Sequence, residues 1–241
     1  MGWKIFSHSV FLLNHNLRDA LRISSPLILA MVLSFVFGGA TTIDNLEAGS
    51  SQSSGLNLLL QLLTAVAGLW VAVAWHRFVL LEEIGNGLPT FHGGRMFAYF
   101  LVVLGMTLVL ALAAGAMGAL AGVLFGSFTP LFFIVIIAIA VFAMWAFYRL
   151  SPLLPAAALG QSIGVKQAWE ATSDISGSVL AAALLLIFFS ILCGAVAALI
   201  MFQVSILVGV ILIAVLQWAY TMVGISILTT IYGITIEGRA I

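Results

Sequence analysis

Six stretches of this chain are apolar for long enough to cross a bilayer, and none has a charged residue or a histidine at its centre. A transmembrane helix needs about 20 apolar residues, because the hydrocarbon core is about 30 Å thick. Lipid offers the backbone no hydrogen-bond partner, so each stretch is expected to be an α-helix. The predicted spans are residues 23–42, 55–75, 96–126, 131–148, 177–201 and 205–233.

The boundary between the last two spans is the least marked. Residues 177–233 form one apolar run, which at about 1.5 Å per residue is far too long for a single span. We place the turn at residues 203–205. The pattern therefore predicts an all-α integral membrane protein, with three αα-hairpins in a transmembrane domain of residues 23–241.

Composition agrees with a chain surrounded by lipid. Hydrophobic residues make up 63% of the sequence and charged residues only 7%, whereas a soluble domain has about 25% charged residues. The lone cysteine, Cys193, lies inside an apolar run and has no second cysteine for an intrachain disulfide.

The basic residues predict the orientation. All eight lysines and arginines fall on one side of the six-span arrangement, and the opposite side carries only Asp44 and Glu47. Loops rich in lysine and arginine stay in the cytoplasm, so we expect both termini there. The eight are Lys4, Arg18, Arg22, Arg77, Arg95, Arg149, Lys166 and Arg239.

Residues 1–22 are predicted to form one amphipathic helix in the cytoplasmic interface. Its apolar face would carry Trp3, Phe6, Val10, Leu13, Leu17 and Leu21. The other face would carry Lys4, His8, His15, Arg18 and Arg22. Anionic lipid is the simplest partner for such a helix, and a docking protein is the alternative.

The third span contains a row of small residues at four-residue spacing: Ala114, Gly118, Gly122 and Gly126. Such a row lets two helix backbones approach closely. We expect the neighbour to be another span of the same chain, with a second subunit as the alternative.

The densest group of ionisable residues is expected at the cytoplasmic ends of the spans. Its members are His76, Arg77, Glu82, Glu83, Arg149 and Glu170. A metal site needs three or four converging ligands, and His92 would join only if its loop folded back. We interpret the group as an ion-pair network, and we expect no metal, no other cofactor and no nucleic-acid partner.

One segment resembles a known family. Residues 148–156 (YRLSPLLPA), followed by the Ala-Trp helix of residues 165–169 (VKQAW), are similar to uncharacterised bacterial six-span membrane proteins. That family looks related to the membrane domain of some glycerophosphodiester phosphodiesterases. The resemblance implies a location in the bacterial inner membrane. It brings no activity, because these residues include nothing like the phosphodiesterase catalytic domain.

These observations are compatible with three functions. The leading expectation is a non-enzymatic scaffold, an accessory subunit of a larger membrane complex, or a protein that organises lipids. The alternative is a transporter or channel for a neutral or apolar solute, with Gln61, Gln217 and Thr221 facing one cavity. A membrane-embedded enzyme would need His76 with Glu82 or Glu83 in one pocket.

Overall fold

The computed structural model describes residues 1–47, 55–85, 87–126 and 128–241, with side chains omitted for 38–47. The described chain is 85% helical and contains no strand. The molecule is an all-α membrane protein. Its helices are α1 (Gly2–His15), α2 (Leu17–Ile23), α3 (Ser25–Glu47), α4 (Gly55–Leu81), α5 (Gly93–Phe125), α6 (Thr129–Leu150), α7 (Leu153–Leu159), α8 (Val165–Ala171), α9 (Ser176–Gln203) and α10 (Ile206–Thr235).

The long helices match the apolar runs because lipid leaves their backbone no other partner. Among the described residues, α4, α5, α6 with α7, α9 and α10 are long and apolar enough to cross a membrane. A sixth crossing is counted if α2 and α3, which meet at a bend of 61°, form one span. The chain turns at Val204 and Ser205 between α9 and α10, inside the segment where we expected the turn.

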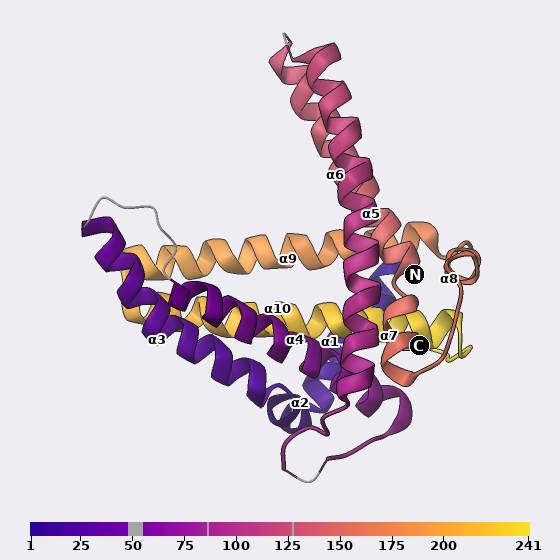
Figure 1. Cartoon of the computed structure of the whole chain (residues 1–241), viewed down its shortest axis with the longest axis horizontal. Helices are drawn as coiled ribbons and strands as arrows, with labels where there is room; N and C mark the ends of the chain where they lie inside the picture. Colours follow the sequence, from indigo (N-terminus) through magenta and orange to yellow (C-terminus); the bar gives the residue numbers. More distant parts are fainter. Residues whose placement is uncertain (48–54, 86, 127) are drawn as a thin grey trace.

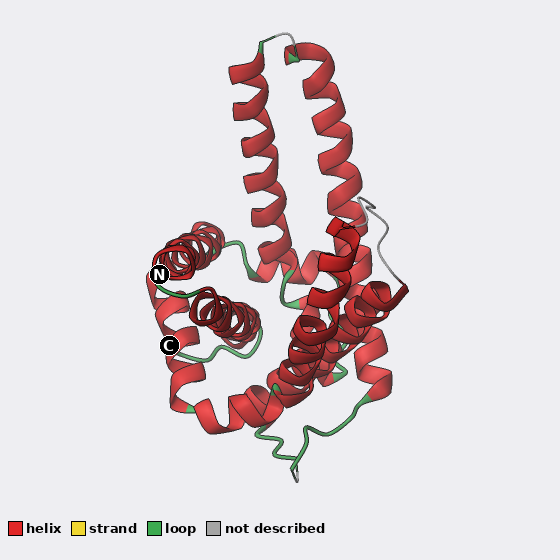
Figure 2. Ribbon diagram, turned by 90° about the vertical axis from the view of Figure 1, so that its left-hand side faces the viewer, coloured by secondary structure: helices red, strands yellow, loops and turns green. Residues whose placement is uncertain are grey.

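Consecutive long helices pack in pairs: α3 against α4, α5 against α6, and α9 against α10. The α5 and α6 pair points away from the other two pairs, as both views show (Figures 1 and 2). Its far part contacts little besides itself, so apolar side chains such as Leu112 and Val123 stay largely exposed. In a membrane these side chains face lipid.

The short helices and both termini gather at one end of the molecule, called the base here (Figure 1). The base comprises α1, α2, α7, α8 and the connections that follow α4 and α10. Helix α1 packs on α9 and α10, α7 packs against α4 and α5, and α8 contacts α6. Pro152 stands at the N-cap of α7, and Gly160 ends that helix in the left-handed conformation with φ of 80°.

The N-terminal segment is two helices, which corrects the prediction of one amphipathic helix. The break lies at Asn16, whose φ of −109° and ψ of 30° are not helical, and whose side-chain amide and backbone N–H both donate to the Leu12 carbonyl oxygen. The apolar face predicted for the lipid interface is also divided. Phe6 and Leu13 are buried against the protein, whereas Trp3 and Val10 are exposed. Their places are taken by the smaller or shorter side chains of Gly2, Ile5 and Ser9.

Close approach explains this choice of face. A Cβ atom on Gly2 would lie 2.5 Å from Ala181 Cβ and 2.9 Å from the Ser178 carbonyl oxygen, so α1 and α9 nearly touch backbone to backbone. The core continues through Trp75 of α4 and Ile227 of α10, both fully buried. The base is therefore a packed layer and not a loosely attached tail.

Candidate functional site

Polar side chains of α10 join it to α4 and α1 inside the base. Trp75 Nε1 donates to Ser226 Oγ at 2.9 Å, and Ser226 donates to its own helix. Ser9 and Thr230 hydroxyls lie 3.1 Å apart. Each group is buried and partnered, so these contacts stabilise the packing without leaving an unsatisfied dipole.

His76 belongs to the same buried layer. Its Nδ1 lies 2.8 Å from Thr229 Oγ1, and its Nε2 lies 3.4 Å from the Tyr99 hydroxyl. Thr229 donates its hydrogen to the Ile225 carbonyl oxygen, so the network is satisfied when His76 carries its proton on Nδ1 and Tyr99 donates to Nε2. His76 is fully buried and acts as a neutral link between α4, α5 and α10.

Glu83 is the centre of an ion-pair group on the connection after α4. Arg77 Nε and Nη2 donate to Glu83 Oε2 at 2.8 and 2.5 Å, and His92 Nε2 donates to Oε1 at 2.6 Å. The loop between α4 and α5 therefore folds back and brings in His92. Burial pushes the pKa of Glu83 upward, but hydrogen bonds and charge from His92 and Arg77 outweigh it and hold the pKa below its ordinary value.

Arg149 forms a separate clasp between α6 and α8. Its guanidinium carbon lies 4.3 Å from the Trp169 ring centre and 5.4 Å from the Trp145 ring centre. Its Nε donates to Thr172 Oγ1 at 2.9 Å, and Nη2 donates to the Trp169 carbonyl oxygen. Stacking and carbonyl dipoles thus solvate a buried cation, for which the described residues supply no carboxylate.

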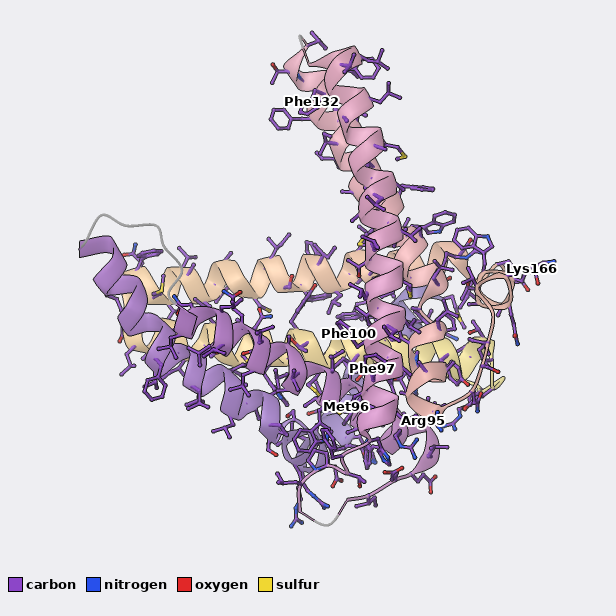
Figure 3. The ribbon with its side chains drawn as sticks, viewed as in Figure 1. Arg95, Met96, Phe97, Phe100, Phe132 and Lys166 are labelled. Carbon is purple, nitrogen blue, oxygen red and sulfur yellow. The ribbon has the colours of Figure 1, made fainter. Side chains whose placement is uncertain are left out.

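The predicted ionisable group is therefore divided into separate parts. Glu82 is exposed, with φ of 56°, and Glu170 lies on the surface 3.8 Å from Lys166 (Figure 3 shows Lys166 at the edge of the base). His76 has none of these residues among its hydrogen-bond partners. Within the part of the chain that is described, no three His, Cys, Asp or Glu side chains converge as metal ligands.

The row of small residues on α5 faces α6. A Cβ atom on Gly118 would lie 3.7 Å from Ile136, and one on Gly122 would lie 3.9 Å from Phe132. These are ordinary contact distances. Ala114 is half-buried, and Gly126 is exposed as the C-cap of α5. A closer approach occurs at Gly209, where a Cβ would lie 2.2 Å from Met201 Cβ beside the turn that joins α9 to α10.

A cavity of about 340 Å³ lies between α9 and α10, next to α1. Its lining residues are Phe6, Leu186, Phe189, Ser190, Cys193, Gly194, Ile213, Leu216, Gln217, Ala219, Tyr220 and Val223. Gln217 lines it, but Gln61 and Thr221 do not. The three polar residues considered for a solute pathway are therefore not gathered around this cavity.

The outer surface of α1 and α2 combines apolar and cationic side chains, and we call it the α1–α2 face. Its exposed apolar members are Trp3, Val10, Phe11, Leu17 and Leu21. Lys4 and Arg18 are exposed on the same two helices, and neither side chain has an ion pair or hydrogen bond to the described residues. Such a surface suits the boundary between anionic headgroups and acyl chains.

Several residues of these networks were not singled out from the sequence. Tyr99, Ser226 and Thr229 look like isolated polar residues in apolar helices, and their partners lie far away in the chain. Thr172 differs because it shares a helical stripe with Trp169 shortly before the fifth span, a local signal for the clasp. Comparison with known proteins finds no matching family model, no matching curated protein and no matching solved structure.

Proposed function

We propose that this chain is a non-enzymatic scaffold of the bacterial inner membrane that organises anionic lipid at the cytoplasmic leaflet. It would act alone or as an accessory subunit of a larger membrane protein complex. The observation that carries the proposal is the α1–α2 face, where Trp3 and Phe11 are 58% exposed beside the unpaired cations Lys4 and Arg18.

Rigid attachment makes this surface suited to the role. α1 is fixed on α9 by the near contact at Gly2 and on α10 by the pair of Ser9 and Thr230. The exposed side chains are therefore held in fixed positions relative to the helices that cross the bilayer. A lipid that binds this face does not have to order the helix first, which lowers the entropic cost of binding.

The proposed topology has six spans in three hairpins, with both termini in the cytoplasm. The supporting observation is the distribution of charge. Every described Lys, Arg, Asp and Glu side chain belongs to one of three groups of segments. These are α1 and α2, the base-side ends of α4, α5 and α6 with the segments next to them, and α8 with the residues after α8 and after α10. The α9–α10 turn at Val204 and Ser205 carries none. The resemblance to the bacterial six-span family agrees with this topology and stays a prediction.

We propose no enzymatic activity because the candidate catalytic groups serve packing. His76 is enclosed by Thr229 and Tyr99, Glu83 is neutralised by Arg77 and His92, and Glu82 lies apart on the surface. Neither the cavity between α9 and α10 nor the small pocket beside Glu83 is lined by His76.

The test measures lipid composition around the purified protein. The full chain is extracted with its surrounding lipid by a detergent-free polymer, and the ratio of phosphatidylglycerol to phosphatidylethanolamine is compared with that of the bulk membrane. We expect enrichment of phosphatidylglycerol. Because each basic residue at a membrane surface contributes about 1 kcal/mol, the double variant Lys4→Gln, Arg18→Gln should weaken the preference by up to about thirtyfold.

Lys166→Gln is the matched control, because it also removes an exposed cation, but one that lies on α8 and outside the α1–α2 face. Enrichment that persists in the double variant, or a bulk lipid ratio around the parent protein, would refute the proposal.

A further inference from the structure

The cavity between α9 and α10 is a groove that runs along both helices. Its lining residues recur at helical spacing, from Leu186 to Gly194 on α9 and from Ile213 to Val223 on α10. Ile213 and Tyr220 are 42% and 39% exposed, so the groove opens outward from the helix pair. It belongs to neither the ion-pair group nor the α1–α2 face.

Small residues on α9 create the groove. Cys193 and Gly194 stand where larger side chains would fill the space, and a Cβ built on Gly194 meets nothing within 4 Å. At the base, Phe6 of α1 closes the groove by stacking on Phe189, with ring centres 5.2 Å apart. The groove thus has a solid aromatic floor and an open side.

The chemistry of the lining limits what can occupy it. No charged side chain lines the groove, and its polar groups are Ser190, Cys193, Gln217 and Tyr220. Ser190 already donates to the Ile187 carbonyl oxygen within its own helix. A phosphate or ammonium group would lose its hydration there without gaining a charged partner, so the lining favours an apolar chain over a headgroup.

The length and the location of the groove identify the acyl chain that occupies it. The ten helical steps from Ile213 to Val223 rise about 15 Å, which is half of the roughly 30 Å hydrocarbon core and therefore the extent of one leaflet. The helices that form the groove are among those long and apolar enough to cross the membrane, so the solvent at its open side is lipid. We propose that this groove holds one acyl chain of a membrane phospholipid, seated on Phe6 and Phe189.

This inference deepens the proposed lipid-organising function and rests on it only for placing α9 and α10 in the bilayer. In functional terms, the groove retains a specific phospholipid, while the α1–α2 face concentrates headgroups. An acyl chain held beside α1 also restrains Phe6, and through Phe6 it restrains α1, which carries part of the α1–α2 face.

The experiment uses the full chain in phosphatidylethanolamine and phosphatidylglycerol vesicles that contain a phosphatidylglycerol with a diazirine in one acyl chain. After irradiation, adducts are mapped by peptide mass spectrometry. We expect adducts to concentrate on residues 186–194 and 213–223. Residues 109–120 of α5 include the highly exposed Val109 and Leu112. The adducts on these residues give the background level of labelling by lipid that merely surrounds the protein.

Gly194→Phe should lower the groove adducts to that surrounding level, because Gly194 lines the groove, a Cβ there meets nothing within 4 Å, and a ring would occupy the space of the acyl chain. Gly194→Leu should have the same effect, and it controls for a folding defect caused by phenylalanine alone. Gly115→Phe is the matched control, since a Cβ at Gly115 also meets nothing within 4 Å, and it should leave the adducts unchanged.

Three outcomes would overturn the inference. The first is uniform labelling of all apolar faces, and the second is groove labelling that survives both Gly194 variants. The third is cross-linking between Cys193 thiols of two copies with no lipid adducts, which would assign the groove to a second copy of the chain. The double variant Lys4→Gln, Arg18→Gln should keep the groove adducts, so failure of the groove and failure of the proposed function are distinguishable.

Discussion

Thr172→Val tests the Arg149 clasp by removing one hydroxyl and little else. Thr172 is fully buried, and its Oγ1 accepts from Arg149 Nε at 2.9 Å. The same hydroxyl lies 2.9 Å from the Arg149 carbonyl oxygen and 3.0 Å from that of Ala168. Valine keeps the branched shape but leaves the guanidinium donor without its acceptor, and it cannot donate to either carbonyl.

The free energy lost in Thr172→Val follows from the charge on the donor, the Arg149 guanidinium. A hydrogen bond to a charged group contributes about 1.5–3 kcal/mol, and here its loss falls on the contact between α8 and the end of α6. The fraction of time that α8 is detached should therefore rise about tenfold to somewhat over a hundredfold, since each 1.36 kcal/mol is a factor of ten.

Limited trypsin digestion reads this opening directly. Lys166 is a cleavage site at the start of α8, and its side chain is 88% exposed. We expect faster cleavage after Lys166 in Thr172→Val, measured in lipid nanodiscs under conditions where cleavage is slower than reclosing. Ser173→Ala is the control, because that neighbouring hydroxyl is exposed and bonds only to nearby groups. Equal cleavage rates in the two variants would refute the clasp.

Other predictions concern the remaining contacts. Thr229→Val should destabilise the folded chain by about 1–3 kcal/mol in detergent titration, because it deprives buried His76 of its partner. The control Thr235→Val should cost much less, because the Thr235 hydroxyl bonds only within α10. Equal losses in the two variants would contradict the His76 network. Gly209→Ala should lower the stability of the folded chain by about 1–3 kcal/mol through overpacking against Met201. The control Gly115→Ala should leave the stability unchanged or raise it. A Gly209→Ala variant as stable as the parent would disprove the close approach. Glu83→Gln should cost less than about 1 kcal/mol at neutral pH, because the ion pairs are partly exposed. The lowered pKa of Glu83 means that its contribution is present above its ordinary value of 4.5 and is lost as pH falls through the folded pKa, so the variant should lose stability less steeply with acid than the parent.

Hydrophobicity predicted the long helices well because it acts locally. The runs that became α4, α5, α6, α9 and α10 each exceed the length that lipid demands, and this holds whatever they pack against. The turn near Val204 followed from length alone, since no glycine or proline marks it.

The contacts of the site were harder to predict from the sequence because they join residues distant in the chain. His76 and Thr229 lie 153 positions apart, and Trp75 and Ser226 lie 151 apart, with no spacing that links them. Likewise, Gly118 stands in a conspicuous row yet makes ordinary contacts, whereas Gly209 stands alone yet makes a very close contact with Met201. Tertiary geometry decides which small residue matters, and the amino-acid pattern carries no record of it.

Labelling of single cysteines from each side of the membrane tests the central claim, which is that a bilayer surrounds the long helices and the base lies at one leaflet. In a Cys193→Ser background, Lys166→Cys and Ser205→Cys are treated in intact cells and in inverted vesicles with a thiol reagent that does not cross membranes. The account predicts that Lys166→Cys reacts only in inverted vesicles and Ser205→Cys only in intact cells. Reaction of both positions from the same side would contradict it.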